Sequence, residues 1–590
     1  MSYPIQWSLS SLGPEPGTER FTQWLTKIRV EYQNFAKNAE NFGEQVTAKS
    51  LTELVKEFSL CRREYWQINS LAECYASSDT AREEYRQAEA AVAALFPHVE
   101  KADHLLDRII KNIDDGTWST LVDNKQLADV KGFIIRRRNE ASTRLPDHLA
   151  DFASELSVDG LNAWSRLYDS FSAAVRIPVM EQGEVKMKSP GQVAFDSPDR
   201  TDRENKFFSS QKAWLSVEET AAATLNHIVG SRLTVNKYAK RESHLTIPMQ
   251  QNRVTQMSID AMWAAITEAK PLVQKYLKTK QKLLGLSELT WYDLEAPLNL
   301  GSTKVTYQES CEIILDAFSK FHPPLRDFTE LALKNGWIEA ADRSGKRQGG
   351  FCIDFPTSEE TRIFMTFRDT EESLSTLAHE LGHAYHAWVL RKHPVVMQVY
   401  PMTLAETAST FAETVVSAQR FEALTTTAEK LNALECQLYD SDAFLMNIHS
   451  RYIFENELHR KRAEGELTAA ELHDLMVKSQ KTAFVDSLSE WNPTFWISKL
   501  HFYISYEPFY NFPYTFGYLL SQRLYEEARQ DPQGFPERYD QFLISTGGPS
   551  ALTAAKEAFG YDLESEAFWS EAIQPIRNRV ELFCKLAEEL

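Results

Sequence analysis

Two histidines and a glutamate stand close together in the stretch from Thr376 to His386, which reads Thr-Leu-Ala-His-Glu-Leu-Gly-His-Ala-Tyr-His. His379 and His383 are four residues apart, so an α-helix places both imidazoles on one face, where they can bind a single metal ion. Glu380 lies about 100° further round such a helix, so it can instead take a proton from a water molecule held by the metal. The pattern H-E-x-x-H therefore predicts a zinc site that hydrolyses peptide bonds.

The residues around this pattern favour a helix. There is no proline between Pro356 and Pro394, and Asp369 followed by Glu372 resembles a capping box at the start of a helix. The apolar face of the helix is formed by Leu374, Leu377, Ala378, Leu381, Ala384 and Tyr385. We therefore expect a buried helix that presents both histidines.

A catalytic zinc ion takes three protein ligands and keeps one position for water. A third histidine in the pattern x-x-G-x-x-H is excluded, because His386 stands where the glycine would be and Val389 where the histidine would be. The other choice is a glutamate from a later helix. Its spacing and small neighbours favour Glu406 as the ligand and Glu413, seven residues on, as a residue that orients a ligating histidine. The reverse assignment of the two glutamates is left open.

Length and composition describe an ordinary globular protein, with 590 residues, 43% hydrophobic and 25% charged. Turn-forming residues at 177–200, which allow one short β-hairpin, predict an N-terminal helical domain at 1–200 and a catalytic domain at 201–590. The net charge of −19 argues against a nucleic-acid partner, and no apolar run is long enough to span a membrane. Six scattered cysteines and the lack of a secretion signal indicate a cytoplasmic protein with reduced thiols.

The hydrophobic pattern predicts a mainly α-helical fold. Amphipathic helices are expected over residues 18–175 and again from residue 201. Two strand-like runs, 351–355 and 363–367, precede the histidine motif and predict a small β-hairpin or sheet beside the zinc-binding helix. A peptide substrate could add to the edge of such a sheet as an extra strand.

The motifs at 379–386 (His-Glu-Leu-Gly-His-Ala-Tyr-His) and 406–413 (Glu-Thr-Ala-Ser-Thr-Phe-Ala-Glu) together resemble the thimet oligopeptidase and oligoendopeptidase F family of zinc metallopeptidases. The bacterial oligoendopeptidase F branch is the most similar, and the resemblance covers roughly residues 200–590. It implies one Zn²⁺ per chain with Glu406 as the third ligand. It also implies two helical halves around a deep channel, in which short peptides are cut at internal bonds.

The aromatic segment 501–518 adds further candidates. In the resembling family, a histidine and tyrosines from this segment donate hydrogen bonds to the oxyanion that forms during hydrolysis. That likeness points to His501 and Tyr510, followed by Tyr503 and Tyr514. Pro508 and Pro513 make one continuous helix unfavourable here.

Three residues nearer the motif are further candidates. His386, one turn beyond His383, is expected to contact a neighbouring helix or the surroundings of the ligands. Gly349 and Gly350 resemble the family's flexible substrate loop.

Two other functions are compatible with the motif: a metallocarboxypeptidase that trims C-termini, and a peptide-binding scaffold without catalysis. Glu380 argues against the scaffold, because a binding protein has no need of a base.

Overall fold

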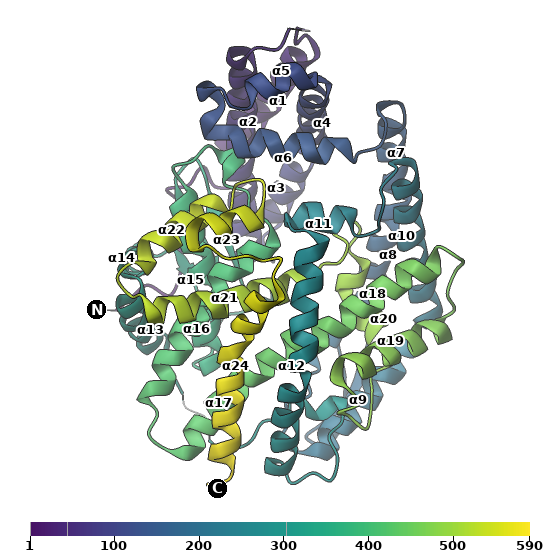
Figure 1. Ribbon diagram of the computed structural model, residues 1–590, viewed down its shortest axis with the longest axis vertical. Helices are drawn as coiled ribbons and strands as arrows, with labels where there is room; N and C mark the ends of the chain where they lie inside the picture. The colour runs from purple at the N-terminus through teal and green to yellow at the C-terminus, as the bar shows by residue number, and fades with distance from the viewer. Residues whose placement is uncertain (1, 44, 302–303) are drawn as a thin grey trace. The chain divides into compact units, whose positions relative to one another are not determined.

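The computed structural model describes residues 2–43, 45–301 and 304–590 and consists mainly of α-helices, as the sequence predicted (Figure 1). The chain forms two compact units, each assembled from three stretches of sequence. The first unit contains Met1–Ser142, Thr303–Glu422 and Leu524–Asp562, and the second contains Thr143–Ser302, Ala423–Arg523 and Leu563–Leu590. Both units hold residues from either side of position 200, and the division of the sequence there stays a prediction.

The two units are built from different helices. The first holds α1 (Glu19–Glu40), α2 (Ala48–Ser78), α3 (Glu83–Ala93), α4 (Phe96–Asn112), α5 (Asp115–Leu121), η1 (Lys125–Val130), α6 (Lys131–Ser142), α13 (Tyr307–Phe321), α14 (Pro323–Lys334), α15 (Glu371–Leu390), η4 (Val395–Met397), α16 (Met402–Ala423) except for its last residue, α22 (Phe535–Ser545) and α23 (Ala551–Phe559). The second holds α7 (Asp147–Asp159), α8 (Leu161–Ala174), η2 (Pro190–Gln192), α9 (Arg200–Leu215), α10 (Glu218–Tyr238), α11 (Thr246–Asn252), α12 (Gln256–Leu283), η3 (Trp291–Asp293), α17 (Thr427–Asp442), η5 (Ala443–Asn447), α18 (Ile448–Arg462), α19 (Ala469–Phe484), α20 (Phe495–Ser498), η6 (Leu500–Tyr503) and α24 (Glu566–Ala587). Helix α21 (Phe512–Gln530) contains the residue at which the chain passes from the second unit to the first.

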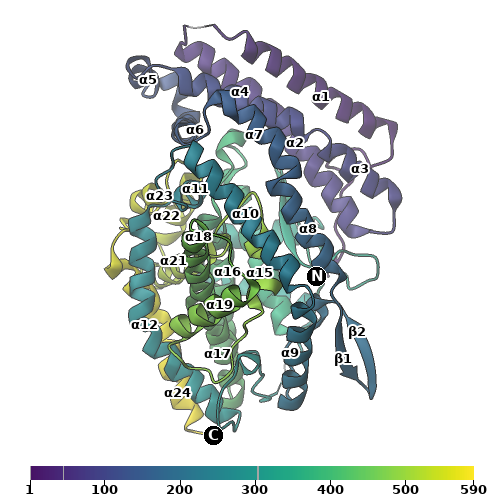
Figure 2. The ribbon, with the colours of Figure 1, turned by 90° about the vertical axis from the view of Figure 1, so that its right-hand side faces the viewer.

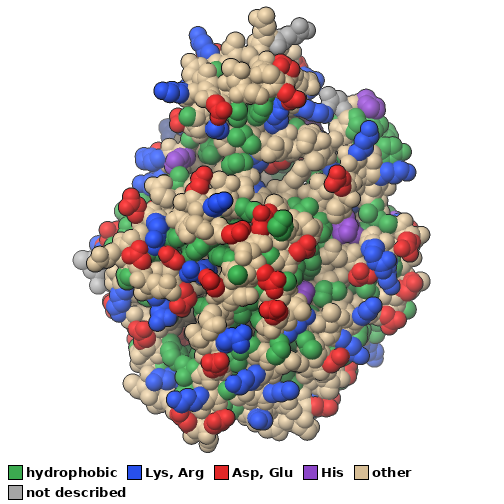
Figure 3. Space-filling model, in the orientation of Figure 1, with side chains coloured by type: hydrophobic (Ala, Val, Ile, Leu, Met, Phe, Trp, Pro, Cys, Tyr) green, Lys and Arg blue, Asp and Glu red, His purple; other side chains and the backbone are tan. Residues whose placement is uncertain are grey.

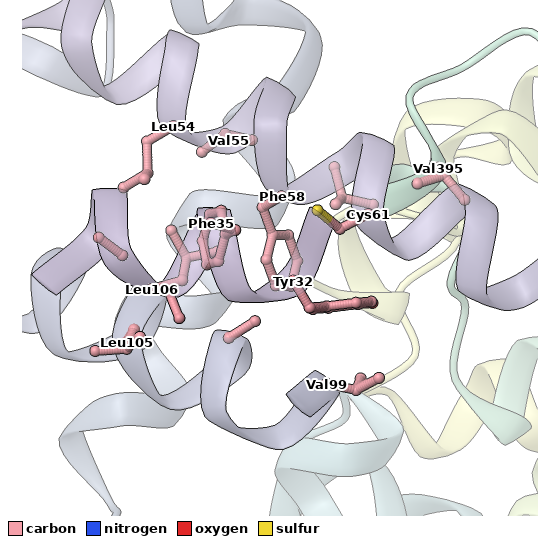
Figure 4. Packing of buried hydrophobic residues seen from close by; sticks show 14 of the residues in the cluster. Tyr32, Phe35, Leu54, Val55, Phe58, Cys61, Val99, Leu105, Leu106 and Val395 are labelled. Carbon is pink, nitrogen blue, oxygen red and sulfur yellow. The ribbon is translucent and has the colours of Figure 1, made fainter. Parts of the chain in front are cut away.

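The apolar core of the N-terminal helices also holds the connector that precedes α16. Phe35 of α1 lies against Phe58 of α2, with 5.6 Å between the ring centroids, and Tyr32 belongs to the same cluster (Figure 4). Val395, in the connector η4 between α15 and α16, is 5% exposed and belongs to this core although it lies more than 250 residues after α6. Burial of one such side chain contributes about 1.5–3 kcal/mol. The core therefore fixes the path of the chain from α15 to α16.

A three-stranded sheet packs against α15, the helix that carries the histidine motif. Its strands lie in the order β3 (Ile338–Glu339), β5 (Glu360–Phe364) and β4 (Phe351–Phe355). Strand β5 is parallel to β3 and antiparallel to β4, so β4 is an edge strand of the described sheet.

The predicted hairpin next to the motif is therefore correct, but its second strand is displaced. The prediction placed this strand at 363–367, whereas β5 ends at Phe364. The backbone N–H groups of Met365 and Phe367 still donate to carbonyls near β3, at 2.9 and 3.0 Å. The chain thus continues in extended form past the end of β5, which explains the strand-like pattern there.

In the second unit, β1 (Ile177–Glu181) and β2 (Glu184–Lys188) form the short antiparallel hairpin allowed by the sequence at 177–200. Figure 2 shows this hairpin beside α9, with which β1 is in contact. Helices α12 and α24 pack together, as do α18 and α19.

Charged side chains of both signs share the surface, and the cysteines are thiols rather than disulfides, as the sequence predicted. On the face shown in Figure 3, acidic and basic side chains are interspersed rather than gathered by sign. The six cysteines are free thiols. Within the described ranges, we find no helix with the length and apolar character needed to cross a lipid bilayer.

Candidate metal centre

Helix α15 directs its two histidines to one point. Thr370 caps the helix, because its hydroxyl accepts a hydrogen bond from the backbone N–H of Ser373 at 3.1 Å. The Nε2 atoms of His379 and His383 lie 3.2 Å apart. Two ring nitrogens at this separation repel each other when both carry lone pairs, unless a cation or a shared hydrogen lies between them. A cation between the two nitrogens would remove this repulsion.

Helix α16 approaches this pair unusually closely. A Cβ on Gly382 would lie 2.6 Å from the carbonyl oxygen of Ala408 and 2.7 Å from Cα of Ser409. These separations are too short for real atoms, so only glycine permits the two helices to cross here. The crossing brings Glu406, two residues before Ala408, to the histidines.

The three donor atoms have the geometry of a zinc site. Oε2 of Glu406 is 3.6 Å from Nε2 of His379 and 3.7 Å from Nε2 of His383. Zinc bonds of about 2.0–2.1 Å in a tetrahedron put neighbouring donors roughly 3.3 Å apart. The separations of the three donors therefore suit three protein ligands of one zinc ion. Over the described parts of the chain, they are the one group of this kind that converges.

Glu413 prepares His379 for this role. Its Oε1 lies 2.6 Å from Nδ1 of His379, and its Oε2 accepts a hydrogen bond from Ser375 Oγ at 2.9 Å. A hydrogen on Nδ1 leaves the lone pair on Nε2, the nitrogen that faces Glu406. Burial opposes a charge on His379, but the carboxylates of Glu413 and Glu406 raise its pKa to about 9. The surroundings therefore favour a cation at this point.

Glu380 has the environment of a proton carrier. Its side chain is buried, and its Oε2 has no hydrogen-bond partner among the residues that the structure describes. Burial raises its pKa to about 7, although His379 opposes the rise. A carboxyl group that titrates near neutral pH can both accept and return a proton.

The glycine loop and His386 have separate roles in this unit. Gly349 has a φ of 97°, which favours glycine, and a Cβ on Gly350 would lie 3.4 Å from Oε1 of Glu380. His386 is fully buried, stacks on Tyr400 at 3.8 Å and shares a 2.7 Å hydrogen bond with the Thr546 hydroxyl. It lies outside the three-donor group, and its packing holds α15 to the end of α22.

The aromatic candidates belong to the second unit. His501 and Tyr510 are partly exposed and their ring centroids are 4.8 Å apart, while Tyr514 stacks on His501 at 6.4 Å. Tyr503, by contrast, is fully buried and stacks on Tyr168 at 3.8 Å, so its contacts are those of a core residue. A role for His501, Tyr510 and Tyr514 in the chemistry of the first unit's histidines stays a prediction.

Two contributors to the centre were not predicted. Ser375 lies four residues before His379, a spacing that places it on the ligand face, so the periodicity of α15 could have revealed it. Gly382 is the one glycine in the helix. Its presence together with the small residues of α16 is a signal for close helix packing.

Gly382→Ala tests the helix crossing. The added methyl group has to push α16 away from α15, so we expect a lower melting temperature, a cost of about 1–3 kcal/mol, and roughly tenfold weaker zinc binding. Thermal unfolding by circular dichroism and zinc competition with a chromophoric chelator measure the two effects. Gly465→Ala is the matched control, because a Cβ there meets no atom within 4 Å. Unchanged zinc affinity in Gly382→Ala contradicts the expected effect of the crossing.

Comparison with known proteins gives matches over most of the chain. The model of peptidase family M3 matches residues 193–575, and the model described as oligopeptidase F matches residues 110–176. Oligopeptidase PepF of Bacillus subtilis (strain 168) is 26% identical over 525 residues, which cover 87% of this chain and 74% of that protein. An oligoendopeptidase F homolog of Lactococcus lactis is 24% identical, covering 71% of this chain and 70% of the relative. The solved structure of oligoendopeptidase-F from Enterococcus faecium superimposes with a TM-score of 0.72 at 19% identity, over 97% of this chain and 100% of the other.

Proposed function

Because the chain belongs to peptidase family M3 and is a metalloendopeptidase, we propose that it uses one Zn²⁺ ion to hydrolyse internal bonds of short peptides. The observation that carries this proposal is the convergence of donor atoms from His379, His383 and Glu406 beside the buried carboxyl group of Glu380. A metal site with three protein ligands and an adjacent base is the arrangement that metal-assisted hydrolysis needs.

The proposed ligands are oriented by their neighbours. Glu413 holds the hydrogen of His379 on Nδ1, and the hydroxyl of Ser409 donates to Oε2 of Glu406 at 3.1 Å. These contacts reduce the freedom that each ligand loses on binding the ion. When bound, Zn²⁺ supplies a Lewis acid that polarises a carbonyl group and lowers the pKa of water.

Glu380 is the proposed general base and general acid. Its carboxylate takes a proton from the water whose oxygen attacks the scissile carbonyl carbon. It then gives a proton to the amine nitrogen as the C–N bond breaks, so the base is regenerated. The buried Oε2 has no hydrogen-bond partner in the described part of the chain, which leaves one oxygen available for these transfers.

Tyr510 is the proposed donor to the oxyanion, with His501 and Tyr514 as neighbours in the same aromatic group. A phenol donates a hydrogen bond at neutral pH without carrying a charge, which suits stabilisation of a developing negative oxygen. The family resemblance supports this role.

The proposed substrates are peptides without fixed structure. Strand β4 is an edge strand, and its backbone can pair with a peptide in extended form. The loop at Gly349 and Gly350 leads directly into β4. In a folded protein most backbone groups are already paired within its own helices and sheets, so few of its segments can add to β4. We place the activity in the cytoplasm, in keeping with the six free cysteines.

The test is mass spectrometry of a mixture of short synthetic peptides after incubation with the zinc-loaded protein, alongside an intact folded protein. We expect internal cuts in the peptides and none in the folded protein. Release of single residues from C-termini contradicts the endopeptidase assignment and favours a carboxypeptidase. Absence of any cleavage leaves only a peptide-binding scaffold.

A further inference from the structure

The hydrogen bonds around His501 determine which of its ring nitrogens carries the hydrogen. Asn511, the residue after Tyr510, is 1% exposed, and its Oδ1 accepts a hydrogen bond from Nη1 of Arg451 at 2.8 Å. A guanidinium group can only donate hydrogen bonds. The Asn511 amide must therefore turn its oxygen, and not its nitrogen, toward Arg451.

The same oxygen lies 2.7 Å from Nδ1 of His501. Since Oδ1 of Asn511 can only accept, Nδ1 of His501 must donate and must carry the hydrogen. The lone pair of the neutral ring is then on Nε2. All of these residues lie within one stretch of the second unit.

Arg451 is itself held in place. Its Nε donates to Oδ1 of Asn447 at 2.9 Å, and its guanidinium lies 5.3 Å above the ring of Phe495. A flipped Asn511 amide is disfavoured, because it would point the NH₂ group at the guanidinium of Arg451, and both of these groups can only donate hydrogen bonds.

A second proton on His501 is disfavoured by its surroundings. Burial, together with the positive charges of Lys499 and Arg451, lowers the pKa of His501 to about 4, although the bond to Asn511 opposes this effect. The ring is neutral at physiological pH, so it has a single N–H, and the bond to Asn511 uses it.

We propose that Arg451 and Asn511 are positioning residues that hold His501 as the Nδ1–H tautomer, so that Nε2 accepts a hydrogen bond from a backbone N–H of the peptide. This inference rests on the proposed function. In this arrangement Tyr510 donates a hydrogen bond to the oxyanion, whereas His501 accepts a hydrogen bond from the substrate. His501 in this tautomer has no hydrogen left for an oxyanion.

The tautomer can be read without substrate, from long-range ¹H–¹⁵N correlations of protein labelled with ¹⁵N-histidine at about pH 7. The signals of His501 are assigned by their loss in His501→Gln. We expect the hydrogen on Nδ1 in the wild type. A hydrogen on Nε2 overturns the proposal, whatever the variants do.

Asn511→Leu removes the acceptor, so both tautomers of His501 should become populated and kcat/KM should fall about tenfold or more. Asn456→Leu is the matched control. Oδ1 of Asn456 lies 3.0 Å from Nε2 of His244, and its Nδ2 donates to the carbonyl of Tyr452. His244 should therefore show the opposite tautomer, with the hydrogen on Nε2. Asn456→Leu should change the signals of His244 and leave those of His501 and the activity unchanged.

The possible outcomes separate a failure of this proposal from a failure of the proposed function. If the wild type shows the expected tautomer and His501→Gln keeps full activity, the proposed hydrogen bond from the peptide to His501 makes no contribution to catalysis, and the proposal is wrong. If Asn511→Leu shifts the tautomer without changing kcat/KM, the acceptor role is overturned while the zinc mechanism stands. Loss of activity in Asn511→Leu together with the tautomer shift supports the proposal, provided that zinc content is unchanged.

Discussion

Glu380→Gln is expected to abolish peptide hydrolysis while zinc remains bound. Glutamine keeps the size of the side chain but cannot take a proton from water, and general base catalysis contributes about 10²–10⁴ in rate. The three converging donor atoms belong to other residues, so the metal site itself is untouched. Steady-state cleavage of a peptide substrate and the zinc content of purified protein, measured by mass spectrometry of the metal, give the two readouts.

Glu372→Gln is the matched control for this variant. Glu372 lies in the first turn of the same helix and is exposed to solvent, so its loss should change neither activity nor zinc content. Loss of zinc in Glu380→Gln identifies Glu380 as a ligand rather than a base. Residual activity close to the wild type excludes it as the proton carrier.

The histidine pair could be predicted from the sequence because its geometry is local. Residues four apart on a helix share a face in any fold, so His379 and His383 needed no knowledge of the rest of the chain. Glu406 was predicted with the help of a second motif and a family resemblance. Its convergence with the histidines depends on Gly382 and on the anchoring of Val395 in a distant core, which no local pattern contains.

Sequence patterns were less informative for residues whose conformation or burial depends on tertiary contacts. The start of α15 was predicted from Asp369, but the cap is Thr370. Asp369 adopts a left-handed conformation with φ of 52°, and its carbonyl accepts a hydrogen bond from Val305, so the preceding chain sets the turn. Tyr503 was a candidate through the family resemblance, and its contact with Tyr168, more than three hundred residues earlier, is one that no local pattern shows.

Sequence patterns also could not show which helices belong to which of the two units. Helices α22 and α23 come late in the chain but complete the first unit, where Thr546 at the end of α22 contacts His386. A buried histidine and a threonine carry no signal of their pairing, because each is equally compatible with many partners. Periodicity identifies which face of a helix is buried, but not which distant helix covers it.

The two glutamates of α16 should respond differently to the same change. Glu406→Gln replaces an anionic donor with a neutral amide, so we expect loss of zinc and of activity, with little recovery when zinc is added. Glu413→Gln leaves the three donors in place and weakens only the orientation of His379, which should reduce zinc affinity about 10–100-fold. Added zinc should then restore most of its activity.

The contacts of Glu413 are the physical reason for this expectation. One of its carboxylate oxygens lies on Nδ1 of His379 and the other accepts from Ser375, so neither is free to bind the ion. Glu406, by contrast, directs Oε2 at both histidine Nε2 atoms. Titration of metal-free protein with zinc, followed by activity at each concentration, measures both variants on one scale. Full recovery of Glu406→Gln with no recovery of Glu413→Gln reverses the assignment and makes Glu413 the third ligand.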